Sequence, residues 1–202
     1  MTDLNSLEKF NQFYSLEKDR TYESSLKDFF QAEVRSRLLE ASPSILDLGP
    51  GSKSLFEDLE FTSVTAIDFS SVAIEKAGLQ AEAQVNYQLR DITKENSIEK
   101  ESYDLIFDSH CLHCIEDESL RKIAFQNIYS GLKPNGIFCA EMMTSAGKNE
   151  GIIPFKYVRS SLVLEEEILS YGFKINYFMI VRDLKFENAN GKCDLLRVIG
   201  RK

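Results

Sequence analysis

The chain has 202 residues, a formal net charge of −8 and an ordinary hydrophobic share of 43%. This length suits one domain, which we expect to comprise an N-terminal helical cap over residues 1–42 and a core over residues 43–202. The acidic charge disfavours a nucleic-acid partner, because phosphate binding needs a basic face. The sequence shows no basic, apolar leader and no apolar run of about 18 residues, and its cysteines are typical of reduced thiols. We therefore predict a cytoplasmic protein with no membrane contact.

The N-terminal stretch is predicted to be helical over residues 4–41, with a break near residues 19–21, because its apolar residues recur at spacings of three and four. Tyr14 and Tyr22 flank the break. They fit boundary aromatics that pack the helices on a sheet, and they also fit a lid over a ligand, in which case they bind the substrate.

The stretch from Ile45 to Ser52 organises the rest of the chain. An apolar run that includes Asp47 predicts a buried parallel strand, and Gly49-Pro50-Gly51 follows it as a turn. The glycines permit positive φ and leave no Cβ between backbone and ligand. Residues 54–59 then have helical spacing. A strand, a glycine turn and a helix N-terminus form a nucleotide cradle, although a tight turn in any α/β fold has the same pattern.

The remaining elements alternate between strands and helices. Strands are predicted over 64–68, 84–89, 103–108 and 137–142, helices over 72–78, 119–132 and 164–171, and a terminal antiparallel pair over 173–181 and 194–200. Residues 133–136 are predicted to form a turn, and residues 144–161 a loop. This alternation predicts a three-layer α/β sandwich, with a mainly parallel seven-stranded sheet and a C-terminal antiparallel hairpin. The order of the strands cannot be read from the sequence.

Five segments carry a resemblance to a known family. They are Ile45–Gly51, Val64–Ser70, Arg90–Ile92, Tyr103–His110 with Leu112-His113, and Leu132–Phe138. In this order and spacing they resemble the glycine loop, the ribose-acid strand, the adenine-side acid, the fourth-strand motif and the turn into the fifth strand of class I S-adenosylmethionine-dependent methyltransferases. The resemblance implies a Rossmann-like fold, S-adenosyl-L-methionine as cofactor and S-adenosyl-L-homocysteine as product.

Physical chemistry supports a cofactor site at the strand ends, because ligands of parallel sheets sit outside the carboxyl ends of the strands. Asp47 suits the ligand's ammonium group, Asp68 the ribose hydroxyls and Asp91 the adenine amine, with Ile92 against the ring. The residues expected to bind the cofactor are Asp47, Gly49, Pro50, Gly51, Asp68, Phe69, Asp91, Ile92, Asp108 and Ser109.

Lys53 is a departure from the family pattern, which often has a third glycine at this place. Its side chain either points to solvent, crowds the methionine end of the cofactor or pairs with the cofactor's carboxylate.

Both histidines of the chain lie in His110-Cys111-Leu112-His113-Cys114. The cysteine spacing suggests a metal or redox site, but a loop that leaves a strand offers little room for tetrahedral ligation, and we predict no metal. His110 or His113 is instead a candidate general base, with His113 expected to matter more, or both line the cofactor site. Glu141, at the end of the fifth predicted strand, is a second candidate base or an acceptor for an amine.

The loop over residues 144–161 is predicted to line the acceptor pocket, with Phe155 and Tyr157 as substrate-binding residues beside Arg159. It also fits an ordinary surface loop. The function expected is direct in-line transfer of a methyl group to O, N or S of a small molecule. The alternatives are a nicotinamide-dependent oxidoreductase and an inactive, methyltransferase-like binding protein.

Overall fold

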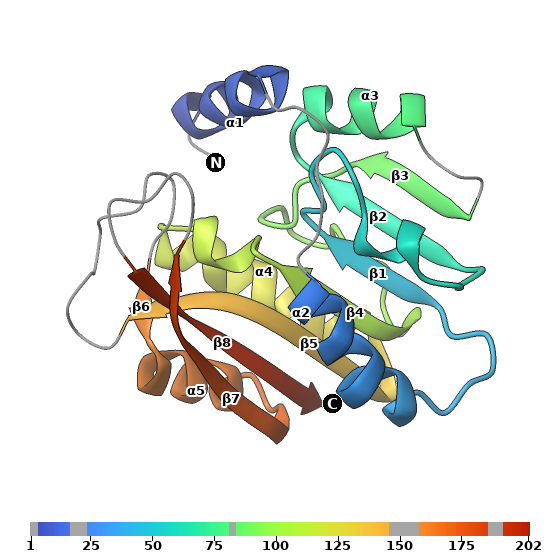
Figure 1. Cartoon of the computed structure of the whole chain (residues 1–202), viewed down its shortest axis with the longest axis vertical. Helices are drawn as coiled ribbons and strands as arrows, with labels where there is room; N and C mark the ends of the chain where they lie inside the picture. The colour runs from blue at the N-terminus through green and yellow to red at the C-terminus, as the bar shows by residue number, and fades with distance from the viewer. Residues whose placement is uncertain (1–3, 17–23, 81–83, 146–157, 186–191) are drawn as a thin grey trace.

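A computed structural model describes the chain except for residues 1–3, 17–23, 81–83, 146–157 and 186–191 (Figure 1). Its centre is one sheet in the order β3-β2-β1-β4-β5-β8-β7, with β6 paired to β5. The strands are β1 Ile45–Leu48, β2 Val64–Asp68, β3 Val85–Leu89, β4 Tyr103–Ser109, β5 Leu132–Ser145, β6 Arg159–Ser160, β7 Lys174–Lys185 and β8 Lys192–Arg201. The helices are α1 Leu4–Leu16, α2 Ser24–Phe29, α3 Ser71–Gln80, α4 Glu118–Gly131 and α5 Ser161–Ser170.

The predicted fold class is confirmed. The strands from β3 to β5 pair in parallel, and β8 pairs antiparallel with both β5 and β7. The two-residue β6 is an addition that the sequence did not predict. The strand order reverses between β1 and β4, so the crevice expected for a ligand lies beyond the carboxyl ends of these two strands.

Two apolar layers cover the sheet because its strands carry apolar residues on both faces. Leu46, Ile106 and Phe138 pack with the inward sides of α4 and α5. On the other face, Ile45 and Phe107 pack with α2 and the turns that follow it. Such two-sided burial is typical of parallel strands and holds the strand ends rigidly.

Some local predictions were wrong. Residues 54–59 form a short 3-10 turn over Leu55–Asp58, called η3, and no α-helix. Gly78 does not end α3, which continues to Gln80, because a helical glycine costs only about 1 kcal/mol. Residues 133–136 bulge within β5, where the pairing with β4 shifts register. The break predicted at residues 19–21 lies outside the described residues.

Candidate active site

The glycine loop after β1 has the backbone geometry that its sequence predicts. Gly49 and Gly51 have φ angles of 60° and 67°, in the left-handed region that favours glycine. The Gly51 N–H donates to Oδ2 of Asp68 at 3.0 Å, which ties the loop to the end of β2. The Ser54 hydroxyl donates to Oδ2 of Asp47 at 2.6 Å, and Ser54 also caps η3. The loop is therefore braced from both neighbouring strand ends.

Cys111, in the loop after β4, lies close to Gly49. A Cβ built on Gly49 would lie 2.7 Å from Cβ of Cys111 and 2.9 Å from its Sγ. The loop after β4 therefore packs directly on the glycine loop, and there is no room for a side chain at this position.

Asp68 is buried and occupies the position expected for a ribose-binding acid. Its Oδ1 accepts a hydrogen bond from the Ser70 N–H at 2.8 Å, while its Oδ2 holds Gly51. Each carboxylate oxygen can accept more than one hydrogen bond, so both backbone contacts leave capacity for ligand hydroxyls. Its two backbone partners hold the carboxylate in place before a ligand arrives.

Helix α1 lies beside this strand end, next to α3 (Figure 1). The Ser70 hydroxyl donates to Oδ1 of Asn11 at 2.6 Å, and the rings of Phe10 and Phe69 meet edge to face at 5.3 Å. Tyr14, expected to bind substrate, is buried in this layer. These contacts fit a packing role for Tyr14 and place α1 close to the Asp68 end of the site.

Asp91 shapes a turn. Its Oδ1 accepts from both the N–H and the hydroxyl of Thr93, at 2.9 and 2.6 Å. The side-chain amide of Asn127 on α4 donates to the Ile92 carbonyl at 2.9 Å and fixes the same turn. The Ile92 side chain is buried in the core on the α4 side.

Asp108 is fully buried at the end of β4, and its Oδ1 accepts hydrogen bonds from the backbone N–H groups of Cys111 and Leu112. Its Oδ2 has no hydrogen-bond partner among the described residues, and neither does Oγ of the adjacent Ser109. Burial raises the pKa of Asp108 to about 7, although the two backbone donors and Arg121 oppose the shift. The carboxyl is therefore about half protonated at neutral pH, and it lies beside the end of β1, which carries Asp47.

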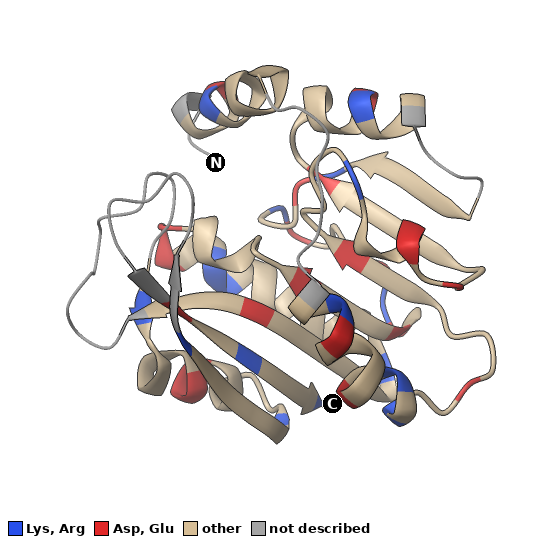
Figure 2. Cartoon of the chain, in the orientation of Figure 1, with Lys and Arg blue, Asp and Glu red and all other residues tan. Residues whose placement is uncertain are grey.

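His110 begins the loop after β4 with a φ of 72°, which is strained for a residue with a side chain. Its Nε2 lies 2.9 Å from Oε1 of Glu141, and Nε of Arg197 lies 2.6 Å from Oε2 of the same carboxylate. Figure 2 shows this acidic segment of β5 beside a basic segment of β8. Burial raises the pKa of Glu141, but the His110 contact and the Arg197 charge outweigh it and hold the pKa below its ordinary value.

Residues 46–140, which include the glycine loop and the ends of β2, β4 and most of β5, match the family model of a methyltransferase domain. The chain has the fold of class I, S-adenosylmethionine-dependent methyltransferases. A search of curated proteins gives no match.

Solved structures share the fold of this chain at low sequence identity. The N-methyltransferase NodS from Bradyrhizobium japonicum WM9, in complex with S-adenosyl-L-homocysteine, has a TM-score of 0.74 and 18% identity, over 98% of this chain and 98% of its own. A SAM-dependent methyltransferase from Methanosarcina mazei has a TM-score of 0.71 and 18% identity, over 84% and 97%. The [4+2]-cyclase SpnF has a TM-score of 0.71 and 15% identity, over 98% and 93%.

The residues at the carboxyl ends of the strands fit S-adenosyl-L-methionine on structural grounds. Two left-handed glycines form a cradle that a Cβ would fill, and the buried acids Asp47, Asp68 and Asp108 face the same strand-end edge. A cationic sulfonium with a neutral adenosine needs such acceptors and no phosphate-binding cations.

The second histidine of the chain, His113, has a different environment from His110. His113 is buried, and its Nδ1 accepts a hydrogen bond from the Met143 N–H at 3.1 Å. The neutral ring therefore carries its proton on Nε2, which favours a donor over a base. Cys114 Sγ lies 3.2 Å from the His110 carbonyl oxygen, while Cys111 faces Gly49. The described residues contain no group of three or more His, Cys, Asp or Glu side chains placed to hold a metal ion.

Lys53 has a partner away from the strand ends, because its Nζ lies 2.8 Å from Oδ1 of Asp58 in η3. Burial raises the pKa of Asp58, but Lys27 and Lys53 outweigh it and lower that pKa below its ordinary value. Tyr22, Phe155 and Tyr157, all expected to bind substrate, lie outside the described residues. Arg159 lies on β6, with Nη1 at 3.4 Å from Oε1 of Glu167.

Sequence reasoning missed Arg197, which lies in β8 and joins the site through Glu141. Its Nη1 and Nη2 donate to the carbonyl and hydroxyl of Ser25 in α2, at 3.0 and 3.1 Å. The signal was available, because a single charge within Leu195–Ile199, an otherwise apolar strand, implies a buried ionic partner.

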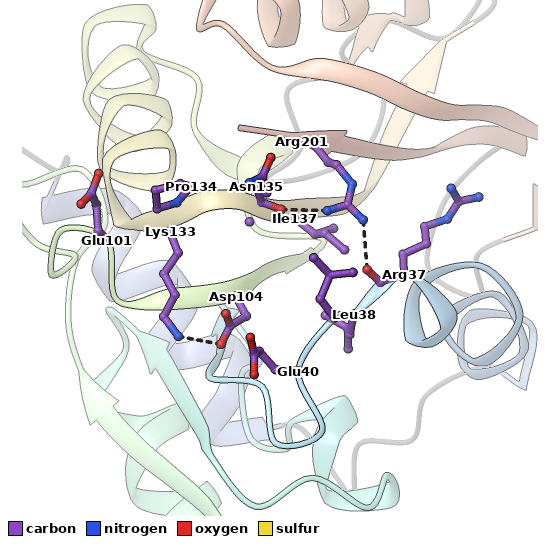
Figure 3. Close-up of a pocket in the computed structure, with 12 residues that line it drawn as sticks. Arg37, Leu38, Glu40, Glu101, Asp104, Lys133, Pro134, Asn135, Ile137 and Arg201 are labelled. Carbon is purple, nitrogen blue, oxygen red and sulfur yellow. Dashed lines mark hydrogen bonds and ion pairs between the residues drawn. The ribbon is translucent and has the colours of Figure 1, made fainter.

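A hollow of about 360 Å³ opens at the opposite edge of the sheet, where β4 and β5 begin (Figure 3). Lys133 lies 2.8 Å from Asp104, and Arg201 donates to the carbonyls of Asn135 and Arg37, at 2.8 and 3.0 Å. None of the residues predicted to bind cofactor or substrate lines this hollow. Among the described residues, no helix has the length and apolar character needed to cross a membrane.

Proposed function

We propose that the chain transfers a methyl group from S-adenosyl-L-methionine directly to an O, N or S atom of a small-molecule acceptor. The observation that carries this proposal is the braced glycine loop between Asp47 and Asp68, with Asp108 at the adjoining strand end. The bound cofactor supplies an electrophilic methyl group, so the protein mainly has to position the acceptor and exclude water.

The residues near the loop divide into positioning roles. Asp68 holds the ribose hydroxyls while it braces Gly51. Asp47 and Asp108 face the cationic methionine end, where negative charge and backbone geometry favour a sulfonium over a neutral group. Asp91 and Ile92 mark the adenine end. The loop that begins with His110 lines the side on which the acceptor approaches.

A small acceptor is favoured over nucleic acid because the chain carries a net charge of −8. The structural similarity to the N-methyltransferase NodS makes a nitrogen acceptor one specific candidate.

Calorimetry with S-adenosyl-L-homocysteine tests the cofactor site. Asp68→Ala should weaken binding by about 1–3 kcal/mol, because it removes the predicted hydrogen bonds to the ribose and the brace on Gly51. Lys133→Ala, at the opposite edge of the sheet, is the matched control and should bind like the wild type. Absence of binding by the wild type, or equal affinity in Asp68→Ala, would contradict the proposal.

Two alternatives predict different ligands. A thermal-shift panel with NADH and S-adenosyl-L-methionine separates a nicotinamide oxidoreductase from a methyltransferase, since stabilisation by NADH alone supports the former. A folded chain that binds neither would support a partner-dependent, inactive role.

A further inference from the structure

The polar chain from α2 through β8 and β5 to the loop after β4 carries an inference that rests on the proposed function and concerns the acceptor. It consists of Ser25, Arg197, Glu141 and His110, in contact in that order. We infer that His110 is the general base of the transfer, held by Glu141 and Arg197, and that the acceptor is therefore a hydroxyl or an ammonium group.

Glu141 and Arg197 are buried, whereas the His110 side chain at the end of the polar chain is partly exposed. The Glu141 and Arg197 side chains are 3% and 6% exposed, whereas the His110 side chain is 25% exposed. The ionised carboxylate is fixed on one oxygen by Arg197 and turned toward His110 with the other. Of the three ionisable side chains, the imidazole is therefore the most accessible to a molecule from solution.

The contact with Glu141 selects the tautomer of His110. The negative charge of a carboxylate oxygen 2.9 Å from Nε2 favours a proton on that nitrogen, so the neutral ring carries its lone pair on Nδ1. The carboxylate also stabilises the imidazolium that forms when Nδ1 takes a proton, and orients the ring. Glu141 and Arg197 are thus positioning residues, and His110 is the residue that meets the acceptor.

The location fits the chemistry. His110 immediately precedes Cys111, whose side chain packs on Gly49 of the cofactor loop. The strained φ of 72° at His110 is retained in a loop that Asp108 fixes through two backbone hydrogen bonds. Strain held by surrounding structure at a ligand edge is typical of a functional residue.

The acceptor class follows from the need for a base. In the transfer, the acceptor atom forms a bond to the methyl carbon while the sulfur–methyl bond breaks, and its electron pair stays on sulfur. The acceptor's proton passes to Nδ1 of His110 and then to water. A hydroxyl or ammonium group retains its proton at neutral pH and needs such a base, whereas a thiol ionises closer to neutrality and needs it least.

Several charged or titratable groups lie near the His110 ring. Glu141 faces it from β5, with Arg197 behind the carboxylate on β8, and the His113 ring lies 5.3 Å away in the same loop. Cys114 contacts the His110 carbonyl, and the buried Asp108 holds the backbone of the next residue. Glu141 lies within ion-pair distance of the imidazole, so we expect its loss to change the His110 pKa.

Nitrogen-15 NMR of the imidazoles tests the device without an acceptor, in the complex with S-adenosyl-L-homocysteine. The chain has 2 histidines, so His113 serves as an internal control in the same spectrum. We expect the Nε2–H tautomer at His110 and a fall of its pKa in Glu141→Gln, with His113 unchanged. The Nδ1–H tautomer, or the same His110 titration in both proteins, would overturn the inference.

Glu141→Gln leaves Arg197 buried without its carboxylate and can fail to fold. Glu141→Gln with Arg197→Gln removes both charges and gives the same NMR readout. Retained binding of S-adenosyl-L-homocysteine shows that a changed histidine does not reflect a lost cofactor site.

Carbon-13 methyl-labelled S-adenosyl-L-methionine, incubated with a small-molecule cell extract, identifies the acceptor atom from the shift of the product methyl. We expect an O-methyl or N-methyl product, and a rate lowered roughly 10²–10⁴-fold in His110→Ala. An S-methyl product, or an unchanged rate in His110→Ala, would overturn the inference. Absence of any labelled product would instead overturn the proposed function, and this inference with it.

Discussion

The two edges of the sheet contain similar side chains in opposite circumstances. At the edge where β4 and β5 begin, the charged groups around the hollow are partly exposed and paired with each other or with carbonyls. At the carboxyl edge, Asp47, Asp68 and Asp108 are buried together, and two glycines adopt left-handed conformations. The hollow offers space, whereas the carboxyl edge concentrates desolvated charge and fixed backbone. We expect the reaction to take place at the carboxyl edge, because desolvation and preorganisation make electrostatic interactions strong.

The largest contrast is expected between two arginines of β8. Arg197→Met leaves Glu141 buried without its cation, so the free energy of unfolding should fall by about 3–5 kcal/mol. Arg201→Met, at the amino edge, loses hydrogen bonds to two carbonyls and should cost less than about 1.5 kcal/mol. Urea unfolding followed by circular dichroism measures both. Equal losses would show that burial does not distinguish the edges.

The second contrast is between two glycines. Gly49→Ala places a Cβ 2.7 Å from Cys111 at a positive φ, so affinity for S-adenosyl-L-homocysteine should fall about tenfold or more. Gly78→Ala in α3 meets nothing within 4 Å, so affinity should not change and the helix should gain up to about 1 kcal/mol. Calorimetry and unfolding curves check the pair, and wild-type affinity in Gly49→Ala would refute the cradle.

The third contrast concerns pH. Burial raises the pKa of Asp108 to about 7, so its carboxyl is half protonated near neutrality. A cationic ligand favours the ionised form, so affinity for S-adenosyl-L-methionine should rise several-fold between about pH 6 and 8. The affinity for S-adenosyl-L-homocysteine, which lacks the sulfonium charge, should rise less over the same range. Asp108→Asn should abolish this difference. At the amino edge, Asp104 has a pKa below its ordinary value, because its Lys133 and Ser44 contacts outweigh burial, and it stays ionised throughout.

Linkage gives the same residue an effect on stability. Because the folded-state pKa of Asp108 lies above that of the unfolded chain, the folded state binds the proton more tightly, and this contribution to stability is largest below the unfolded value of about 4. It is lost as the pH rises toward about 7. Denaturation of wild type and Asp108→Asn at several pH values isolates this contribution, since the asparagine does not titrate.

The smallest effect is expected at the hollow. Lys133→Ala removes a partly exposed ion pair with Asp104 and should lower the free energy of unfolding by less than about 1 kcal/mol. A loss of S-adenosyl-L-homocysteine affinity in this variant would place ligand chemistry at the amino edge and reverse the comparison.

The sequence predicted the fold because its strands are apolar runs that end in turn residues, as at Ile45–Gly51. It also predicted the acids at the strand ends, because parallel strands bring their carboxyl ends together. It could not predict strand order, and so it could not place β8 beside β5 or Arg197 beside Glu141. The choice between His110 and His113 needed the hydrogen bond from Met143, a contact between residues 30 positions apart.

The bond between Arg197 and Ser25 has a consequence for the order of assembly. The two residues are separated by 172 positions, and contacts of such separation form late and slow folding. During synthesis on the ribosome, α2 and β5 emerge before β8. Glu141 therefore has no contact with Arg197 until the last strand has been synthesised. The glycine loop, within residues 45–68, can form early, whereas the contact of Glu141 with Arg197 forms only when β8 pairs with β5. We therefore expect the cofactor site to form before the catalytic site is complete as each chain is synthesised and folds.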